Sequence, residues 1–139
     1  MSDLIVTTMN DLPGYRIVDV YGEVFGLTVR SRHIGSDIGA SLKGLVGGEI
    51  KGYTKMLADS RLQAIERLRD AAREAGANAI IAMRFDSGAI GQWSEICAYG
   101  TAVWVQPVSD YAKEQHAAIQ QQAGVLPHQQ DYSTRAQGR

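Results

Sequence analysis

Cysteine and proline are scarce in this sequence of 139 residues, with one and three occurrences respectively. The single cysteine, Cys97, excludes an intramolecular disulfide, so packing rather than cross-linking must stabilise the fold. Long apolar runs are also lacking, and the first residues show no basic segment followed by an apolar one. These absences predict a cytoplasmic protein that neither crosses nor binds a membrane.

An excess of charge of one sign is lacking as well. The chain has 14 Lys and Arg residues against 15 Asp and Glu residues, which gives a formal net charge of -1, and the basic residues are scattered. Nucleic-acid binding requires a basic surface that neutralises phosphates. The sequence therefore argues against a nucleic-acid partner.

The apolar residues make up 45% of the chain and predict one α+β domain. The expected elements, in chain order, are a strand at 4–7, a strand at 15–30, a short helix at 34–46, a long helix from about 53, and strands at 79–86 and 93–106. The strand at 15–30 should bend near Gly22 or Gly26, and Gly76 should end the long helix. We predict a two-layer fold in which an antiparallel sheet carries its helices on one face.

The composition changes after Pro107. Ser109 and Asp110 are suited to begin a helix that runs to about residue 123, but the apolar stripe of this helix is thin. From residue 124 onward the chain offers almost nothing to bury. We therefore predict a domain at 1–107 and a C-terminal extension at 108–139, which is part helix and has a disordered end unless a partner orders it.

The last strand has two apolar faces. Its odd positions run from Trp93 through Cys97 and Tyr99 to Val105, and its even positions include Ile96 and Trp104. A sheet with helices on one side normally turns a polar face to water. Two explanations remain open: a second copy of the chain covers the other face, or the strands curl and bury both faces within one subunit.

Several short motifs occur in a characteristic order. They are Gly14-Tyr15-Arg16-Ile17-Val18, Gly22-Glu23-Val24-Phe25-Gly26, Asp37-Ile38-Gly39-Ala40, Gly47-Gly48-Glu49, Tyr53, Gly76-Ala77-Asn78-Ala79 and Gly100-Thr101-Ala102-Val103. Together they resemble the YbjQ-like family of small bacterial proteins over residues 4 to about 105. The resemblance implies a dodecin-subunit-like α+β fold and a homopentamer. It also implies heavy-metal binding, the label that the family carries, but no catalytic residue to transfer.

A metal site is the first candidate to test against the residues. Soft metals require gathered thiolate or imidazole ligands, and the sequence has no Cys-x-x-Cys or His-x-x-x-His pair. His33 and Cys97 are the candidate ligands within the matching region, where only assembly across subunits would bring copies of them together. A buried and inert Cys97 is the alternative.

The remaining candidates are a glycine-rich stretch, a group of polar residues and three aromatic residues, and structural roles explain each of them as well. The stretch 47–52 ends with a phosphate-loop spacing, but Tyr53 and Thr54 replace the required Lys and Ser or Thr. Ser36, Asp37, His33 and Glu95 form no nucleophile elbow, carboxylate pair or triad. Trp93, Tyr99 and Trp104 are suited either to stacking on a flat ligand or to an aromatic core or subunit interface.

These observations favour a protein that is not an enzyme. The leading hypothesis is an oligomeric binding or scaffold module for a metal ion or small ligand, with the five subunits that the resemblance implies. The alternative is a protein-interaction adaptor that binds a partner protein through its C-terminal tail, with several copies adding avidity. An enzyme with a site between subunits would require His33, Asp37 or Glu95 to cluster in a pocket.

Overall fold

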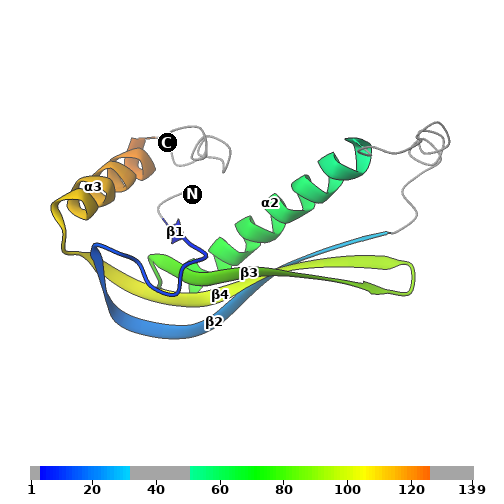
Figure 1. The fold of residues 1–139 in the computed structure, drawn as a ribbon, viewed down its shortest axis with the longest axis horizontal. Helices are drawn as coiled ribbons and strands as arrows, with labels where there is room; N and C mark the ends of the chain where they lie inside the picture. Colours follow the sequence, from blue (N-terminus) through cyan, green and yellow to red (C-terminus); the bar gives the residue numbers. More distant parts are fainter. Residues whose placement is uncertain (1–3, 32–50, 126–139) are drawn as a thin grey trace.

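The structure is a computed structural model and describes residues 4–31 and 51–125. Its elements are β1 (Ile5–Val6), β2 (Tyr15–Ser31), α2 (Lys51–Glu74), β3 (Ala79–Ile90), β4 (Trp93–Pro107) and α3 (Asp110–Val125). The strands form one sheet in the order β1-β3-β4-β2, and both helices lie on the same side of it (Figure 1). The predicted α+β class, with helices on one face, is confirmed.

Gly22 and Gly76 have the structural roles that the sequence predicted. The pairing of β2 with β4 shifts between Val20 and Gly22, and Gly22 has a φ of 101°, which confirms the predicted bend. Gly76 follows α2 with a φ of 89°, a left-handed conformation that glycine adopts without a Cβ clash. The predicted helix at 34–46 and the chain after residue 125 lie outside the described residues.

The sheet differs from the prediction in two details. Its β1 pairs in parallel with β3, Ile5 opposite Ala79, so the sheet is mixed rather than entirely antiparallel. The pairs β2–β4 and β3–β4 are antiparallel. Also, β3 continues to Ile90, and the hairpin turn contains only Gly91 and Gln92. Gly91 has a φ of 59°, as the first residue of a type II′ turn requires.

The helix α2 packs closely on the centre of the sheet. Its residues Ala64, Leu68 and Ala72 are fully buried in the main core cluster, against Ala98 and Ala102 of β4. Small residues on both elements let the backbones approach each other. Below the helix, a Cβ on Gly26 would lie 2.3 Å from the carbonyl oxygen of Ala64, so a glycine is needed at this contact.

A second core cluster forms on the other face of β3 and β4, at the end of the sheet near α3. There Val103 and Val105 are fully buried and pack with Ala79, Ile81 and the partly buried Leu12. Leu12 lies between β1 and β2, which occupy opposite edges of the sheet, so this connection crosses the sheet. The strands also curve at this end (Figure 1). The curl, one of the two explanations left open by the sequence, therefore buries both faces, but only at this end of the sheet.

The helix α3 is anchored to the domain at its first turns. The Ser109 hydroxyl accepts a hydrogen bond from the Ala112 amide at 3.0 Å, which confirms the predicted cap. The Tyr15 hydroxyl donates to Oε1 of Gln115 at 2.9 Å. Burial, and then the neighbouring Tyr111, raise the pKa of Tyr15, so this phenol stays protonated as a donor.

Candidate functional site

The face of the sheet opposite α2 exposes large apolar side chains toward the hairpin end. We call this surface the open face and define it by Phe25, Leu27 and Val29 of β2, Ile90 of β3, and Trp93, Cys97 and Tyr99 of β4. Phe25 lies opposite Tyr99, Leu27 opposite Cys97, and Ile90 opposite Trp93, so these residues are neighbours on one side of the sheet. The exposed fractions of Phe25, Val29, Ile90, Trp93 and Tyr99 range from 44% to 68%.

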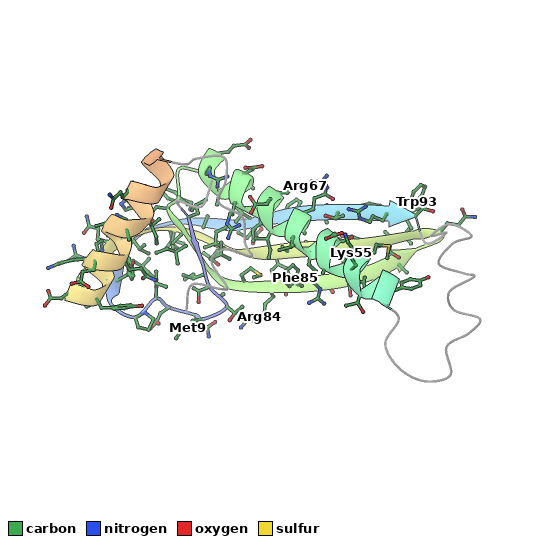
Figure 2. All side chains as sticks on the ribbon, turned by 90° about the horizontal axis from the view of Figure 1, so that it is seen from above. Met9, Lys55, Arg67, Arg84, Phe85 and Trp93 are labelled. Carbon is green, nitrogen blue, oxygen red and sulfur yellow. The ribbon has the colours of Figure 1, made fainter. Side chains whose placement is uncertain are left out.

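The aromatic residues predicted as a stacking wall or interface do not all meet. Trp93 and Tyr99 belong to the open face, whereas Trp104 occupies an even position of β4, opposite Asp19. From above, Trp93 lies at the far end of the strands, away from α3, and Phe85 lies beside α2 (Figure 2). The Arg61 guanidinium lies 4.9 Å from the centre of the Phe85 ring, so this aromatic residue belongs to the helix side.

Cys97 lies in the middle of the open face and is half-buried rather than fully buried as the inert alternative required. Its neighbour across the sheet is Asp86, and Glu95 precedes it by two positions on the same face. Burial raises the pKa of the Cys97 thiol, and the negative charges of Glu95 and Asp86 raise it further. The thiolate that would bind a soft metal is thus disfavoured within one subunit.

We expect this pKa to be visible in the pH dependence of Cys97 alkylation. Iodoacetamide reacts with the thiolate, so the pH of the half-maximal rate should lie above the ordinary pKa of a thiol. The substitution Glu95→Gln should lower that pH because it removes a neighbouring negative charge. Glu74→Gln, at the exposed end of α2, should leave the pH profile unchanged. An identical profile for Glu95→Gln and the unsubstituted protein would contradict the assignment.

The second candidate site is a cavity of about 480 Å³ on the helix side, between α2 and the hairpin end of the sheet. We call it the helix–sheet pocket. From the helix it is lined by Tyr53, Met56, Leu57 and Ser60, whose spacing places them on one face of α2. From the strands it is lined mainly by Thr28, Arg30, Ser87, Ser94 and Ile96.

Sequence reasoning missed this pocket, although a signal was present. The strand positions that face α2 are apolar or small near the middle of the sheet, as at Ala98 and Ala102, but become hydroxylic at Ser87 and Ser94. A change from apolar to hydroxyl side chains on the helix-facing side marks the place where tight packing ends. This change predicts a pocket only once α2 is known to lie over that part of the sheet.

The remaining predicted site residues are not brought together by the described chain. His33, Ser36, Asp37 and His128 fall outside it, as do residues 47–50 of the glycine-rich stretch. His116 lies on α3, where its ring meets the Tyr15 ring edge-on at 6.4 Å between centroids. Within residues 4–31 and 51–125, no three His, Cys, Asp or Glu side chains gather in a way that would hold a metal ion. In the same ranges, neither helix is long and apolar enough to span a membrane.

Comparison with known families matches residues 4–106 to the YbjQ family, whose description reads "Putative heavy-metal-binding". The Streptomyces griseus UPF0145 protein is 56% identical over 108 residues, which cover 77% of this chain and 89% of that protein. An archaeal UPF0145 protein, from Thermoplasma acidophilum, is 56% identical over 111 residues, covering 79% and 93% of the two chains. The Lactococcus lactis UPF0145 protein is 51% identical over 108 residues, covering 78% and 100%.

Among solved structures, a protein of unknown function from Pediococcus pentosaceus, assigned to the DUF74 family, has a similar fold. The TM-score is 0.52 at 16% sequence identity, and the match covers 74% of this chain and 98% of that one. At this identity the similarity concerns the fold alone. None of these relatives is named for an enzymatic activity.

Proposed function

Because the chain belongs to the YbjQ family, we propose that it acts as a non-enzymatic binding module that assembles into a closed homo-oligomer and holds a small ligand or metal ion. In this proposal the open face packs against other copies of the chain. The family resemblance set out above predicts five copies. The helix–sheet pocket, on the opposite side of the sheet, would remain accessible in each of them.

The observation that carries the proposal is the exposure of the open face. Phe25 is 59% exposed, Ile90 68% and Trp93 54%, and the register places these residues on one contiguous surface. Soluble monomers rarely expose an apolar surface of this kind, because each large side chain left in water forgoes about 1.5–3 kcal/mol of burial free energy. A protein surface that covers the open face recovers that free energy.

A second copy of the chain fits the open face for two further reasons. The face carries charges of both signs, since Arg84 lies opposite Tyr99 while Asp86 and Glu95 flank Cys97, so one copy offers partners for the charges of another. In addition, two strand edges are free in the described chain. The outer strand β2 pairs only with β4, and β3 runs on to Ile90, past its last backbone hydrogen bond on the β1 side, from the Met83 amide to the Thr7 carbonyl. Strand edges of this length favour pairing between copies.

Native mass spectrometry of the untagged protein tests the proposal. The protein is measured as isolated and again after zinc, copper or nickel is added one at a time. We expect a mass of five chains, and stoichiometric adducts where a metal ion is the ligand. A pentamer without metal adducts leaves a small organic ligand as the cargo, whereas a single-chain mass at physiological concentration overturns the proposed assembly.

A further inference from the structure

The helix–sheet pocket forms where short side chains of the sheet face the apolar side of α2. On the sheet, Thr28 and Ser87 flank Ile96, and Arg30 and Ala89 flank Ser94, so two successive cross-strand rows present mostly short side chains. On the helix, Met56 and Leu57 face these rows. Short hydroxyl side chains cannot fill the space below a helix as leucine or isoleucine would. The cavity follows from this mismatch.

The size and lining of the pocket are those of a ligand site. Its volume of about 480 Å³ falls within the range of roughly 300–1,000 Å³ that is typical of small-molecule pockets. Met56, Leu57 and Ile96 provide an apolar wall. The hydroxyls of Thr28, Ser60, Ser87 and Ser94 add donors and acceptors, of which Thr28 already donates to the Ser60 carbonyl oxygen at 3.2 Å.

Arg30 supplies a positive charge to the lining of the pocket. Its Nη2 donates to Oε1 of Gln63 on α2 at 3.2 Å, which holds the guanidinium between the strand and the helix and leaves its other N–H groups as donors. The other charged lining residue is Glu95, in the row of Val29 and Gly88. Strand alternation directs its side chain to the open face, where its charge acts on Cys97. The pocket side of the sheet therefore carries a cation.

We propose that the helix–sheet pocket binds a small organic carboxylate with an apolar or aromatic body. The carboxylate contacts the Arg30 guanidinium and the Ser94 hydroxyl, and the body lies against Met56, Leu57 and Ile96. Guanidinium–carboxylate pairing is charge-assisted and directional, so it selects this head group over a neutral one. This inference names the ligand class for the small-ligand part of the proposed function and rests on it, but it does not depend on the number of subunits.

The test uses benzoate and its neutral isostere benzamide as probes of the full-length protein. Methyl resonances of Met56, Leu57 and Ile96 report binding in NMR titrations, and native mass spectrometry of the same samples reports assembly. We expect benzoate to shift these methyl signals with saturation. In Arg30→Gln we expect the benzoate affinity to fall about tenfold, as for loss of a charge-assisted hydrogen bond, while the benzamide affinity stays within about twofold.

The matched control is Arg16→Gln. Arg16 lies on the same strand, is also exposed and donates to a glutamine, Gln106, at 2.8 Å, but it lies at the end of β2 away from the pocket. This variant should bind benzoate as the unsubstituted protein does. Equal losses in Arg16→Gln and Arg30→Gln would overturn the proposal, because they would show attraction by overall charge.

A cavity-filling variant tests the location independently. Ser94→Leu places a larger side chain in the pocket and should abolish saturable shifts with both probes, while the other methyl signals show that the fold is kept. Saturable binding that survives in Ser94→Leu, or no saturable shift with benzoate in the unsubstituted protein, would overturn the inference. Either result with the oligomeric mass intact leaves the proposed assembly standing, and a single-chain mass with normal benzoate binding contradicts the assembly alone.

Discussion

Lysine in place of Phe25 is expected to convert the assembled protein into single chains. Phe25 is 59% exposed within one subunit, so the substitution removes little packing from the fold itself. In the proposed assembly it buries a charged group at the centre of each apolar contact, next to Tyr99. The loss should be about 2 kcal/mol or more for each interface, as for other central interface residues, and a closed oligomer contains several interfaces.

Native mass spectrometry together with circular dichroism measures this effect. The matched control is Tyr111→Lys, which introduces the same charge at an aromatic residue on α3 that is 74% exposed and lies outside the open face. We expect the control to keep the mass of the unsubstituted protein. An oligomer that survives Phe25→Lys at unchanged concentration would show that copies of the chain do not meet through the open face.

Alanine in place of Gly26 is expected to destabilise the fold by about 3 kcal/mol or more, because overpacking against backbone leaves no flexible group to move aside. The added Cβ would lie 2.3 Å from the Ala64 carbonyl oxygen and 2.4 Å from the Leu68 amide nitrogen. Both atoms belong to the α2 backbone, so the whole helix must shift away from the sheet. That shift would also break the hydrogen bond from Arg67 to the Leu27 carbonyl.

Chemical denaturation of Gly26→Ala and Gly88→Ala compares a blocked position with an open one. Gly88 lies on β3 with no atom within 4 Å of an added Cβ, so its substitution should change the free energy of unfolding by less than about 0.5 kcal/mol. Both variants add one methyl group to a glycine within a β-strand. Similar unfolding free energies for both would contradict the close helix–sheet contact at Gly26.

The secondary structure was largely predictable because its signals are local. The odd–even alternation of β4, the apolar stripe of α2 and the caps at Gly76 and Ser109 each arise within a few residues, and the structure places the elements accordingly. The parallel position of β1 was not predicted. It depends on Ile5 meeting Ala79, a partner far along the chain, and no local pattern encodes that choice.

The candidate sites were also predictable only in their local features. Two apolar faces on β4 were visible from the alternation of its residues, but alternation does not say what covers a face. Curl and the crossing segment at Leu12 bury Val103 and Val105, while the same face stays exposed at Tyr99 and Trp93. Cys97 was singled out as a residue, yet its half-buried position between Glu95 and Asp86 required the register of β3 and β4.

By itself the sequence determined the kind and order of the elements that the structure describes, the family, the lack of a gathered metal motif and the surplus of apolar strand positions. These properties depend on residue type and on spacing along the chain. Only the tertiary structure decided which apolar positions remain open, that Gly26 must admit a helix backbone, and that Arg30, Ser94 and Met56 line one pocket. These properties depend on distances between residues remote in sequence, which exist only once α2 lies across the sheet.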